Sequence, residues 1–569
     1  MDFNNGGITY SIVFQASRHF ESGFQQRYSG INANDWRMPI IRYGLNFFGW
    51  KERLLSSNYT GNFEISQQNW NSSARRVDAV MHLFLNGLRY FAWEYNGLVV
   101  ERYITQGSAR DGLKVIAADE FDSMVLFKIP ELWKYLAADR DTEDPSFCRM
   151  KVVGLTGSQI QHRFPRLCKE GVFILSKSGD IYFSSKAMHE QVFESMIDKT
   201  IARINNLKKA WINEVKLSRK MNPPAINIEI LNRGIRPSHG TQRIAIDFVP
   251  AICIDTESVK FRGSLREFPI YAVCKWQGKP ETDCHTWSVK SNSYENALID
   301  AARKDERGLL VLNALMLVKT FFQNAKTMNL PLQLVYVLKT YHLKQIMLYL
   351  LGFLCYKHTH ITIDGTEAAL IYFVRVMDMV LMNKSLPHLF FSDVGILQNV
   401  IPGCNLHCGR DVNLLENVST ESASQAMKDL ELKLMPALGI RWVDKRDLDQ
   451  GSFCNDFVTN VLKQRPQIAN SYIIKSAEAL QQQQQQQRQE KQQLNQQQHF
   501  LTRIHQIGNM RTMRGFAEQR PQSDLVVKHF NESLNRFDLR VGTARPPRYH
   551  PYILPEGVRK FAGATPTYF

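Results

Sequence analysis

The sequence predicts a mixed α/β (α+β) lobe followed by a C-terminal helical lobe, and three observations support this fold class. Segments 114–130 and 243–255 have the alternating apolar pattern and the β-branched content of strands. From Tyr294 onward, helical periodicity continues for roughly 90 residues, interrupted by Pro, Gly or Asn. Strands followed by a run of helices indicate an α/β lobe joined to a helical lobe.

The composition is that of a globular protein with a basic surplus. The chain has 569 residues, of which 44% are apolar and 22% charged, and this balance excludes a wholly disordered or fibrous chain. There are 70 Lys and Arg against 54 Asp and Glu, so the formal net charge is +16. Such a surplus favours polyanionic partners, namely nucleic acid, nucleotides or an anionic membrane surface. From charge alone, a solubilising surface is an equal alternative.

Targeting signals and cysteines bear on the expected compartment. The N-terminal residues lack a basic region followed by an apolar core, so no secretory signal is expected. The longest apolar stretch, 346–355, is shorter than the ~18 to 20 residues that span a bilayer, so no membrane span is expected. The nine cysteines are scattered, as reduced thiols are. We therefore expect a cytoplasmic protein, with a nuclear location left open.

The first elements are an extension and a long helix. Residues 1–60 are rich in Asn, Gly and aromatic residues without a long period, which predicts an N-terminal extension. From Ser72 to Tyr95, apolar residues recur at helical spacing until Asn96-Gly97 stops the run. This pattern predicts an amphipathic helix that leads into Gly107-Ser108.

The sequence also predicts a second helix, and it divides the chain after the N-terminal extension into five further regions. Segment 201–220 is predicted to be a helix, with Ile201, Ile204, Trp211 and Val215 on one side and basic residues on the other. The predicted domains after the extension are the α/β lobe with its leading helix (61–285), the helical lobe (286–440), a linker (441–480), a Gln-rich low-complexity tract (481–498) and a flexible basic tail (499–569).

Three carboxylates form the main candidate site. Glu120 and Asp122 lie two residues apart on a predicted strand, so both side chains leave the same face and repel each other unless a cation lies between them. With Asp247 on a second strand, the set can hold two divalent ions. Such ions align an attacking hydroxyl with the α-phosphate of a nucleoside triphosphate and neutralise the leaving pyrophosphate.

A glycine and a serine add phosphate-binding groups. Gly107 lets the backbone approach phosphates, and Ser108 offers a hydroxyl and a backbone N–H at a predicted helix start. Each signal alone is common in long chains and usually structural. Their order is more specific: a helix, Gly-Ser, eleven residues, Glu-Phe-Asp on a strand, and a later strand with an isolated Asp are the layout of a nucleotidyltransferase palm.

Five short motifs, in order, resemble one family. The stretch GS-x-x-x-GLKVIAADEFDSMVLFKIP resembles the cyclic GMP-AMP synthase-like receptors and the related Mab-twenty-one-like nucleotidyltransferases. Further similar segments are AIDFVPAI (245–252), LMLVKTFFQNAK (315–326), LKTYHLKQIML (338–348) and SLPHLFFSD (385–393). The resemblance covers roughly residues 70 to 440 and implies a nucleotidyltransferase palm with a C-terminal helical lobe.

The resemblance also implies roles for individual residues. Glu120, Asp122 and Asp247 match the family's catalytic metal carboxylates, which bind Mg²⁺ or Mn²⁺, and Gly107-Ser108 match its phosphate-contacting pair. The residues matched in the helical lobe are Lys319, which contacts substrate, and Thr340 and Tyr341, which orient and stack on a base.

Two departures from the vertebrate DNA sensors of this family concern zinc and base selection. No cysteine lies between Cys284 and Cys355, where those sensors insert a zinc module, so no zinc and no DNA clamp built on it are expected. Their base-recognising Arg after a Trp is matched by Ser288 after Trp287, so the bases used are expected to differ.

The basic residues of segment 201–220 are candidates for nucleic-acid binding. The family's ligand-binding helix would fall there, and the functional interpretation is phosphate contact with double-stranded nucleic acid, RNA being favoured over DNA because the zinc module is missing. A solvated charged face is the equal alternative. The candidates are Arg203, Lys208, Lys209, Lys216, Arg219 and Lys220.

The sequence thus predicts a nucleic-acid-activated enzyme that makes a cyclic dinucleotide messenger from ATP and GTP in innate immune signalling. The first alternative is a catalytically silent Mab-twenty-one-like scaffold acting in development. The second is a template-independent polymerase or tRNA-type nucleotidyltransferase, which shares the palm but does not need the TYHLK helix. The activating ligand, the linkage and a ligand-induced oligomer stay open.

Overall fold

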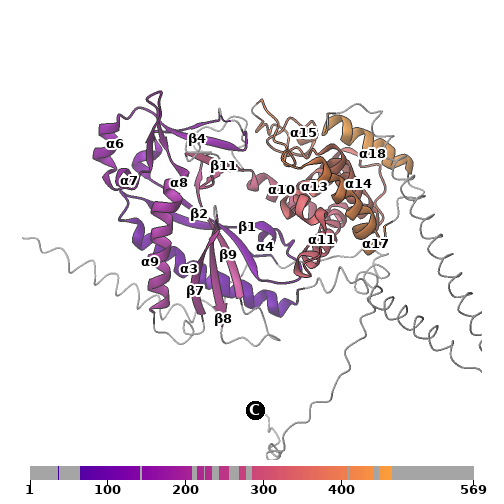
Figure 1. Ribbon diagram of the computed structural model, residues 1–569, viewed down its shortest axis with the longest axis horizontal. Coiled ribbons are helices and arrows are strands. Elements are labelled where there is room, and N and C mark those ends of the chain that lie inside the picture. Colours follow the sequence, from indigo (N-terminus) through magenta and orange to yellow (C-terminus); the bar gives the residue numbers. More distant parts are fainter. Residues whose placement is uncertain are drawn as a thin grey trace, which may run out of the picture. The chain divides into compact units, whose positions relative to one another are not determined.

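The computed structural model describes residues 36–37, 65–140, 142, 144–207, 215–222, 225–232, 243–254, 268–276, 285–407, 409–440 and 447–463. All of them belong to the first of two compact units, residues 1–481 (Figure 1). The predicted Gln-rich tract and basic tail lie outside the described residues, as does most of the predicted N-terminal extension.

The predicted leading helix is confirmed as α3, Gln67–Ala92. The Ser66 side chain caps it by accepting a hydrogen bond from the Asn69 N–H. Its apolar stripe is buried, and Phe84 packs edge-to-face on Phe248 of strand β9 (Arg243–Cys253), with the ring centroids 5.3 Å apart. The helix therefore lies against the sheet that carries the candidate carboxylates.

A strand that the sequence analysis missed follows α3. Strand β1, Val99–Gln106, pairs antiparallel with β2, Glu120–Lys128, so the leading helix does not run directly into Gly107-Ser108. Few β1 side chains are buried, which explains why its sequence, VVERYITQ, lacks a clear strand pattern. Its last residue, Gln106, pairs with Asp122 and so places Gly107 beside the carboxylates.

The described strands form one eleven-stranded mixed sheet, which confirms the α/β lobe. Its main path runs β1-β2-β9-β10-β11-β4-β6-β5, and β2 pairs with β9 in parallel while the other neighbours on this path are antiparallel. The remaining bounds are β3 Leu136–Asp139, β4 Phe147–Val152, β5 Phe173–Leu175, β6 Ile181–Phe183, β7 Val215–Asn222, β8 Ala225–Asn232, β10 Tyr271–Val273 and β11 Thr286–Lys290.

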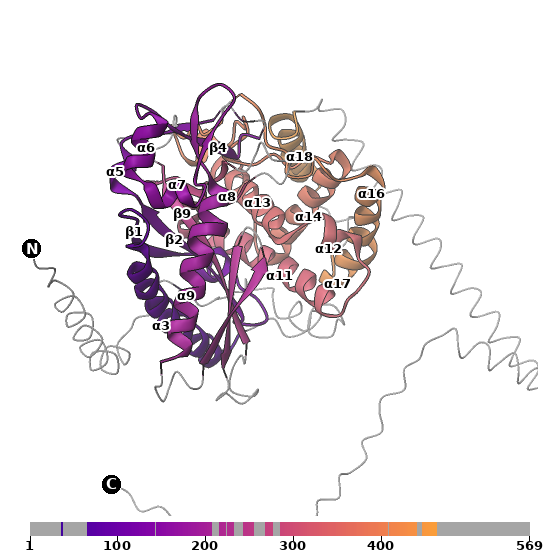
Figure 2. The same cartoon turned by 60° about the vertical axis from the view of Figure 1, so that its left-hand side comes forward.

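Helices α3 and α9 lie side by side on this lobe (Figure 2). Helix α9, Glu194–Asn205, continues a π-helical segment, Met188–Phe193, and buries Ile197, Ile201 and Ile204. The short helices of the lobe are α4 Gly107–Asp111, α5 Pro130–Trp133, α6 Gly157–Arg163, α7 Pro165–Lys169 and α8 Ser185–Ala187.

The predicted basic helix over 201–220 is wrong. Helix α9 ends at Asn205, and the chain re-enters the description as β7, which pairs with β8 and through it with β9. The Asn205 side chain makes two hydrogen bonds to the backbone of Leu217, at 2.9 and 3.0 Å, and so joins the helix end to the strand. The edge of β8, whose sequence AINIEILN alternates strongly, gives this segment a strand partner that local periodicity does not reveal.

The predicted helical lobe is confirmed. Its central helix, α11, spans Glu306–Thr327 and is buried along most of its length. The other elements are α10 Asn292–Ala302, α12 Gln333–Val337, α13 Thr340–Leu350, η3 Leu351–Lys357, α14 Thr366–Asn383, α15 Leu397–Val400, α16 Thr420–Asp429, η4 Leu430–Leu434, α17 Met435–Leu438 and α18 Asp447–Asn460.

Among the described residues, α11 is long and apolar enough to cross a membrane by length and composition alone. Of its most apolar 18-residue window, 78% is buried within the structure. A core helix of a globular protein also meets this criterion of length and composition. The burial of α11 is therefore that of a core helix of the helical lobe.

Part of the predicted linker 441–480 is a packed helix. In α18 the ring of Phe453 lies 5.6 Å from that of Phe353, and both rings are fully buried. Asp456 of the same helix forms an ion pair with Lys357 at 2.8 Å and a hydrogen bond with Nε2 of His358 at 2.7 Å. The helical lobe therefore extends beyond residue 440, while 464–480 lie outside the described residues.

Two residues of the predicted N-terminal extension are built into the α/β lobe. Trp36 is 2% exposed, and its ring meets Phe121 edge-to-face at 5.0 Å between centroids. Arg37 donates its backbone N–H to the Ala109 carbonyl at 3.0 Å, and its guanidinium binds Asp300 of α10. These contacts join residues 36–37 to α4, to α10 and to β2, the strand that carries Glu120 and Asp122.

We expect Trp36→Ala to lower the free energy of unfolding by about 3 to 5 kcal/mol, because a fully buried indole leaves a cavity against Phe121. Urea denaturation followed by circular dichroism measures this difference. The matched control is Trp93→Ala: Trp93 is 70% exposed, so its removal should change stability by less than about 0.5 kcal/mol. Equal stability of both variants would mean that the Trp36 contact contributes nothing.

Candidate active site

Strands β2 and β9 bring the three predicted carboxylates together. In their parallel register Asp122 is paired with Asp247, and Glu120 lies two residues earlier on the same face as Asp122. One oxygen from each of the three carboxylates lies within 4.8 Å of the others. Carboxylate oxygens at this spacing are the ligands that Mg²⁺ and Mn²⁺ prefer, so the residues fit a divalent ion.

The cluster holds more negative charge than its surroundings neutralise. Burial, together with the negative charges of the neighbouring Glu120 and Asp247, raises the pKa of Asp122 to about 7. Burial also raises the pKa of Asp247, although the Asn227 side-chain amide donates a 2.7 Å hydrogen bond to it. A bound cation would offset this repulsion and favour the ionised form of both groups.

Lys114 is a neighbouring cation that the sequence analysis did not select. Its ammonium lies 2.9 Å from Glu120 and 3.2 Å from Asp119, and the Lys114 charge lowers the pKa of Glu120 although burial opposes it. Lys114 follows the Gly-Leu of the first motif, so its position in that motif was the available signal.

Only glycine fits at position 107. Its φ is +67°, in the left-handed region, and a Cβ added there would overlap the Asp122 carboxylate. The chain then turns into α4, which begins at Gly107, and Ser108 lines the same cavity as the carboxylates. The predicted helix start at Gly107-Ser108 is therefore confirmed.

Lys319 reaches the same region from the helical lobe. Its side chain is 9% exposed, and its ammonium donates a 2.6 Å hydrogen bond to the Leu113 carbonyl, just before Lys114. Burial lowers the pKa of Lys319 to about 7, and the nearby positive charge of Lys114 adds to this effect. An anionic ligand in the cavity would favour the charged form of this amine.

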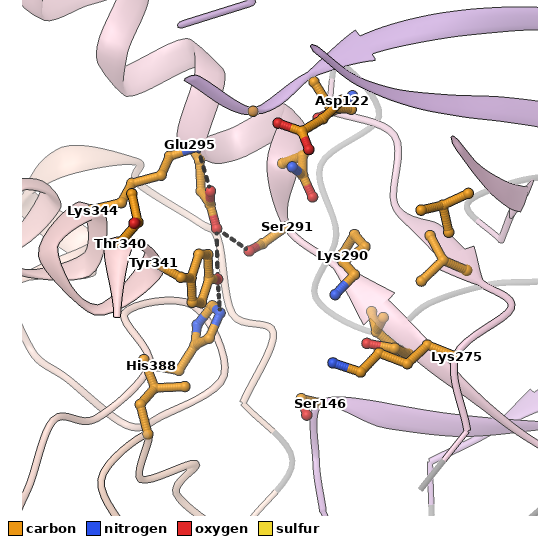
Figure 3. A pocket seen from close by; sticks show the side chains of 18 of the residues that line it. Asp122, Ser146, Lys275, Lys290, Ser291, Glu295, Thr340, Tyr341, Lys344 and His388 are labelled. Carbon is orange, nitrogen blue, oxygen red and sulfur yellow. Dashed lines mark hydrogen bonds and ion pairs between the residues drawn. The ribbon is translucent and has the colours of Figure 1, made fainter. Parts of the chain in front are cut away.

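Tyr341, at the start of α13, presents its ring to the cavity while its hydroxyl is held from behind (Figure 3). The hydroxyl donates to Glu295 at 3.1 Å, lies 2.8 Å from Nε2 of His388, and accepts from Gln345 at 3.1 Å. Burial lowers the pKa of His388 to about 4, so this ring is neutral at pH 7. These contacts fix the Tyr341 ring, which is 41% exposed, as a surface on which a base can stack.

Lys344 connects the two lobes beneath Tyr341. Its ammonium forms ion pairs with Asp111 at 2.8 Å and with Glu295 at 2.9 Å. Burial alone would lower the pKa of Lys344, but the two carboxylates outweigh it and raise the pKa. The sequence signal was its position three residues after Tyr341 on one helix, which places both side chains on neighbouring parts of the same face.

The three carboxylates, Gly107, Ser108, Lys319, Tyr341 and Lys344 line one cavity of about 820 Å³. Strands of the α/β lobe form one wall and helices of the helical lobe the other. The structure brings together eight of the predicted site residues here: Gly107, Ser108, Glu120, Asp122, Asp247, Lys319, Thr340 and Tyr341. Four lining residues that the sequence analysis missed are Lys275, Lys290, Glu295 and Lys344.

The predicted nucleic-acid residues do not form one helical face. The guanidinium of Arg203 on α9 lies over the Tyr90 ring at 4.4 Å, and that of Arg219 on β7 forms 2.8 Å ion pairs with Glu194 and Asp198. Lys216 is exposed on β7. Lys208, Lys209 and the side chain of Lys220 lie outside the described residues.

The fold and the site define a nucleotidyltransferase domain, a mixed α/β lobe followed by a helical region. Residues 109–301 match the family model of the Mab-21 protein nucleotidyltransferase domain, and this match confirms the resemblance seen in the sequence. The match covers Glu120, Asp122 and Asp247 but ends before Lys319 and Tyr341. A comparison with curated proteins found no match.

Proposed function

We propose that the protein is a metal-dependent nucleotidyltransferase that joins ATP and GTP into a cyclic dinucleotide when double-stranded nucleic acid binds. The observation that carries this proposal is the pairing of Asp122 with Asp247, beside Glu120, in a cavity that also contains Lys319 and Tyr341. The Mab-21 nucleotidyltransferase domain supports the transfer chemistry.

Glu120, Asp122 and Asp247 would hold Mg²⁺ or Mn²⁺. When bound, such ions neutralise the triphosphate and lower the pKa of the attacking hydroxyl. Gly107 gives the backbone room to approach phosphate oxygens, and the Ser108 hydroxyl donates to them. The carboxylates lie on the paired strands β2 and β9, and Gly107 and Ser108 directly follow β1, which pairs with β2; this arrangement holds the reacting atoms in line.

The helical lobe would hold the remaining parts of the nucleotides. The Lys319 ammonium, positioned by the Leu113 carbonyl, pairs with a phosphate oxygen, and the Tyr341 ring stacks on a base. Thr340 lines the cavity next to that ring and orients the base. The similarity of the TYHLK helix to cyclic dinucleotide synthases favours a cyclic product over a growing polymer.

The proposal extends to innate immune signalling in the cytoplasm, with double-stranded RNA favoured over DNA as activator and an oligomer forming on it. The +16 net charge supports a polyanionic activator. The alternative is a catalytically silent Mab-21-like scaffold. The intact carboxylate set favours the enzyme, because three converging carboxylates without a metal role carry only repulsion.

The direct test incubates the purified full chain with the four labelled nucleoside triphosphates and Mn²⁺, with double-stranded RNA, double-stranded DNA or neither. We expect a cyclic dinucleotide in the RNA sample, identified by mass spectrometry and by linkage-specific nucleases. Linear products would indicate a polymerase-type nucleotidyltransferase. No product under any condition would support the scaffold.

Neutralising Lys208, Lys209 and Lys216 together by Gln is expected to weaken RNA binding and flatten its salt dependence. Each lost phosphate contact removes roughly 0.7 to 0.9 from the slope of log K against log salt. Turnover at saturating RNA should persist. The control replaces three exposed lysines elsewhere, Lys177, Lys428 and Lys433, with the same charge change. Identical slopes for both triple variants would place the nucleic-acid surface elsewhere.

A further inference from the structure

Two amines line the cavity wall that faces Tyr341 (Figure 3). Lys290 is the last residue of β11 and lies two residues after Ser288, so both side chains leave the same face of the strand. Lys275 follows β10, the strand paired with β11. Figure 3 shows both ammonium groups directed into the cavity.

Neither amine is neutralised by the part of the chain that the structure describes. The other cavity lysines have fixed partners: Lys344 binds Asp111 and Glu295, and Lys319 binds the Leu113 carbonyl. Within the described residues, the side-chain ammonium groups of Lys275 and Lys290 are in no hydrogen bond and no ion pair within 4 Å, although the backbone N–H of Lys275 donates to the Val273 carbonyl. Burial lowers the pKa of Lys290 to about 8, and the charge of Lys275 contributes. The Asp144 carboxylate acts on the charges of both amines but makes no ion pair with either among the described residues, so both ammonium groups can donate to a ligand.

We propose that Lys275 and Lys290 select guanine by donating hydrogen bonds to O6 and N7 of a base stacked on Tyr341. This inference rests on the proposed function and names a substrate of that site. An ammonium is a donor only, and guanine presents two adjacent acceptors along this edge, whereas adenine presents one acceptor beside an amino group. The two amines therefore match both acceptors of guanine, whereas with adenine one of them would face the amino group, which is itself a donor.

The position of the pair favours a base over a phosphate. The groups suited to a triphosphate, Ser108 and Lys319, lie with the carboxylates that would bind the metal. Lys275 and Lys290 instead face the fixed aromatic ring. The hydroxyls of Ser146 and Ser288 line the same cavity, and neutral hydroxyls suit a base edge.

This assignment changes what Ser288 implies. The sequence comparison placed Ser288 where the vertebrate enzyme has a base-recognising Arg, which suggested the loss of a guanine contact. The structure places the amine of Lys290 on the same face of β11, two residues after Ser288. We infer that guanine recognition is retained through different side chains.

The test measures equilibrium binding of GTP, 7-deaza-GTP and ATP to the full chain with Mg²⁺ and without activating nucleic acid. 7-deaza-GTP lacks only the N7 acceptor. For the unsubstituted protein we expect GTP to bind roughly 10-fold more tightly than either analogue. In Lys290→Met and in Lys275→Met, the affinity for GTP should fall roughly 10-fold, towards the affinity for 7-deaza-GTP. The affinity for ATP should change by less than about 2-fold.

The matched control is Lys339→Met, which removes an exposed cation near the cavity that is not among its lining residues. It should leave the three affinities in the same order and ratio. Should Lys290→Met fail to fold, as judged by thermal melting, Lys290→Gln serves instead and should lose part of the preference.

Two results would overturn the inference. If the Lys→Met variants lost affinity for ATP and GTP equally, and if inorganic tripolyphosphate no longer competed with nucleotide binding, the amines would be assigned to phosphate. Equal affinities for GTP and 7-deaza-GTP in the unsubstituted protein would mean that N7 is not recognised. If GTP selectivity holds but no nucleotides are joined under any condition, the proposed function fails while this assignment stands.

Discussion

Asp247→Asn is expected to lower nucleotide joining by on the order of 10³-fold, equivalent to about 4 kcal/mol of transition-state stabilisation. The substitution keeps the volume of the side chain and the oxygen that accepts from Asn227, but it removes a charge from the set that would bind the metal. Initial rates at saturating Mn²⁺ measure the loss. Binding of Mn²⁺, followed by electron paramagnetic resonance, should weaken in parallel.

The fold of this variant should be unharmed. Burial raises the pKa of Asp247 in the folded protein above its value in the unfolded chain. Ionisation of this carboxyl therefore destabilises the folded state once the pH exceeds the pKa of the unfolded chain. Asn avoids that cost, and the metal-free melting temperature at pH 8 should equal or exceed that of the unsubstituted protein.

The matched control is Asp119→Asn, the same chemical change one residue before Glu120. Asp119 pairs with Lys114 and is not part of the three-carboxylate cluster, so this variant should keep most of its activity. Wild-type turnover by Asp247→Asn would contradict the metal assignment. Equal losses in both variants would point to general electrostatics.

Gly107→Ala is the second change with a large expected effect. The added Cβ would overlap the Asp122 carboxylate, so the carboxylate, the backbone or both must move. A displacement of about 1 Å at a reacting centre can cost on the order of 10²-fold in rate, and we expect a loss of at least this size. Single-turnover rates with saturating nucleotide and metal measure it.

Gly97→Ala separates this overlap from backbone strain. Gly97 has a similar positive φ, +75° against +67°, but no atom lies within 4 Å of the position that its Cβ would take. Both variants should lose about 1 to 2 kcal/mol of stability through the left-handed conformation, and only Gly107→Ala should lose activity. Activity retained by both would mean that Asp122 adapts without consequence.

The parts of the site that the sequence predicted are those with local signals. Glu120 and Asp122 share a strand face because strand periodicity is two, and the strand around Asp247 has the same clear pattern. The helices of the second lobe follow from their apolar periodicity and breaks. Tyr341 and Lys319 came from resemblance to a family, which carries information about tertiary placement that periodicity does not.

The errors lie where a partner decides the structure. Residues 215–220 were predicted as part of a helix over 201–220 but belong to β7, which pairs with β8, and β1 was missed because few of its side chains are buried. Helix α18 was taken as linker, since the rings that bury Phe453 lie about 100 residues earlier in the chain. In each case the stabilising contact is distant in sequence.

The sequence by itself determined the order of the lobes and the residue types of the candidate site. Only the tertiary structure decided which of them meet: the parallel register that pairs Asp122 with Asp247, the overlap that requires glycine at 107, and the wall that carries Lys275 and Lys290. The physical reason is that strand and helix periods are set by neighbours along the chain, whereas register, burial and charge are set by contacts between distant segments.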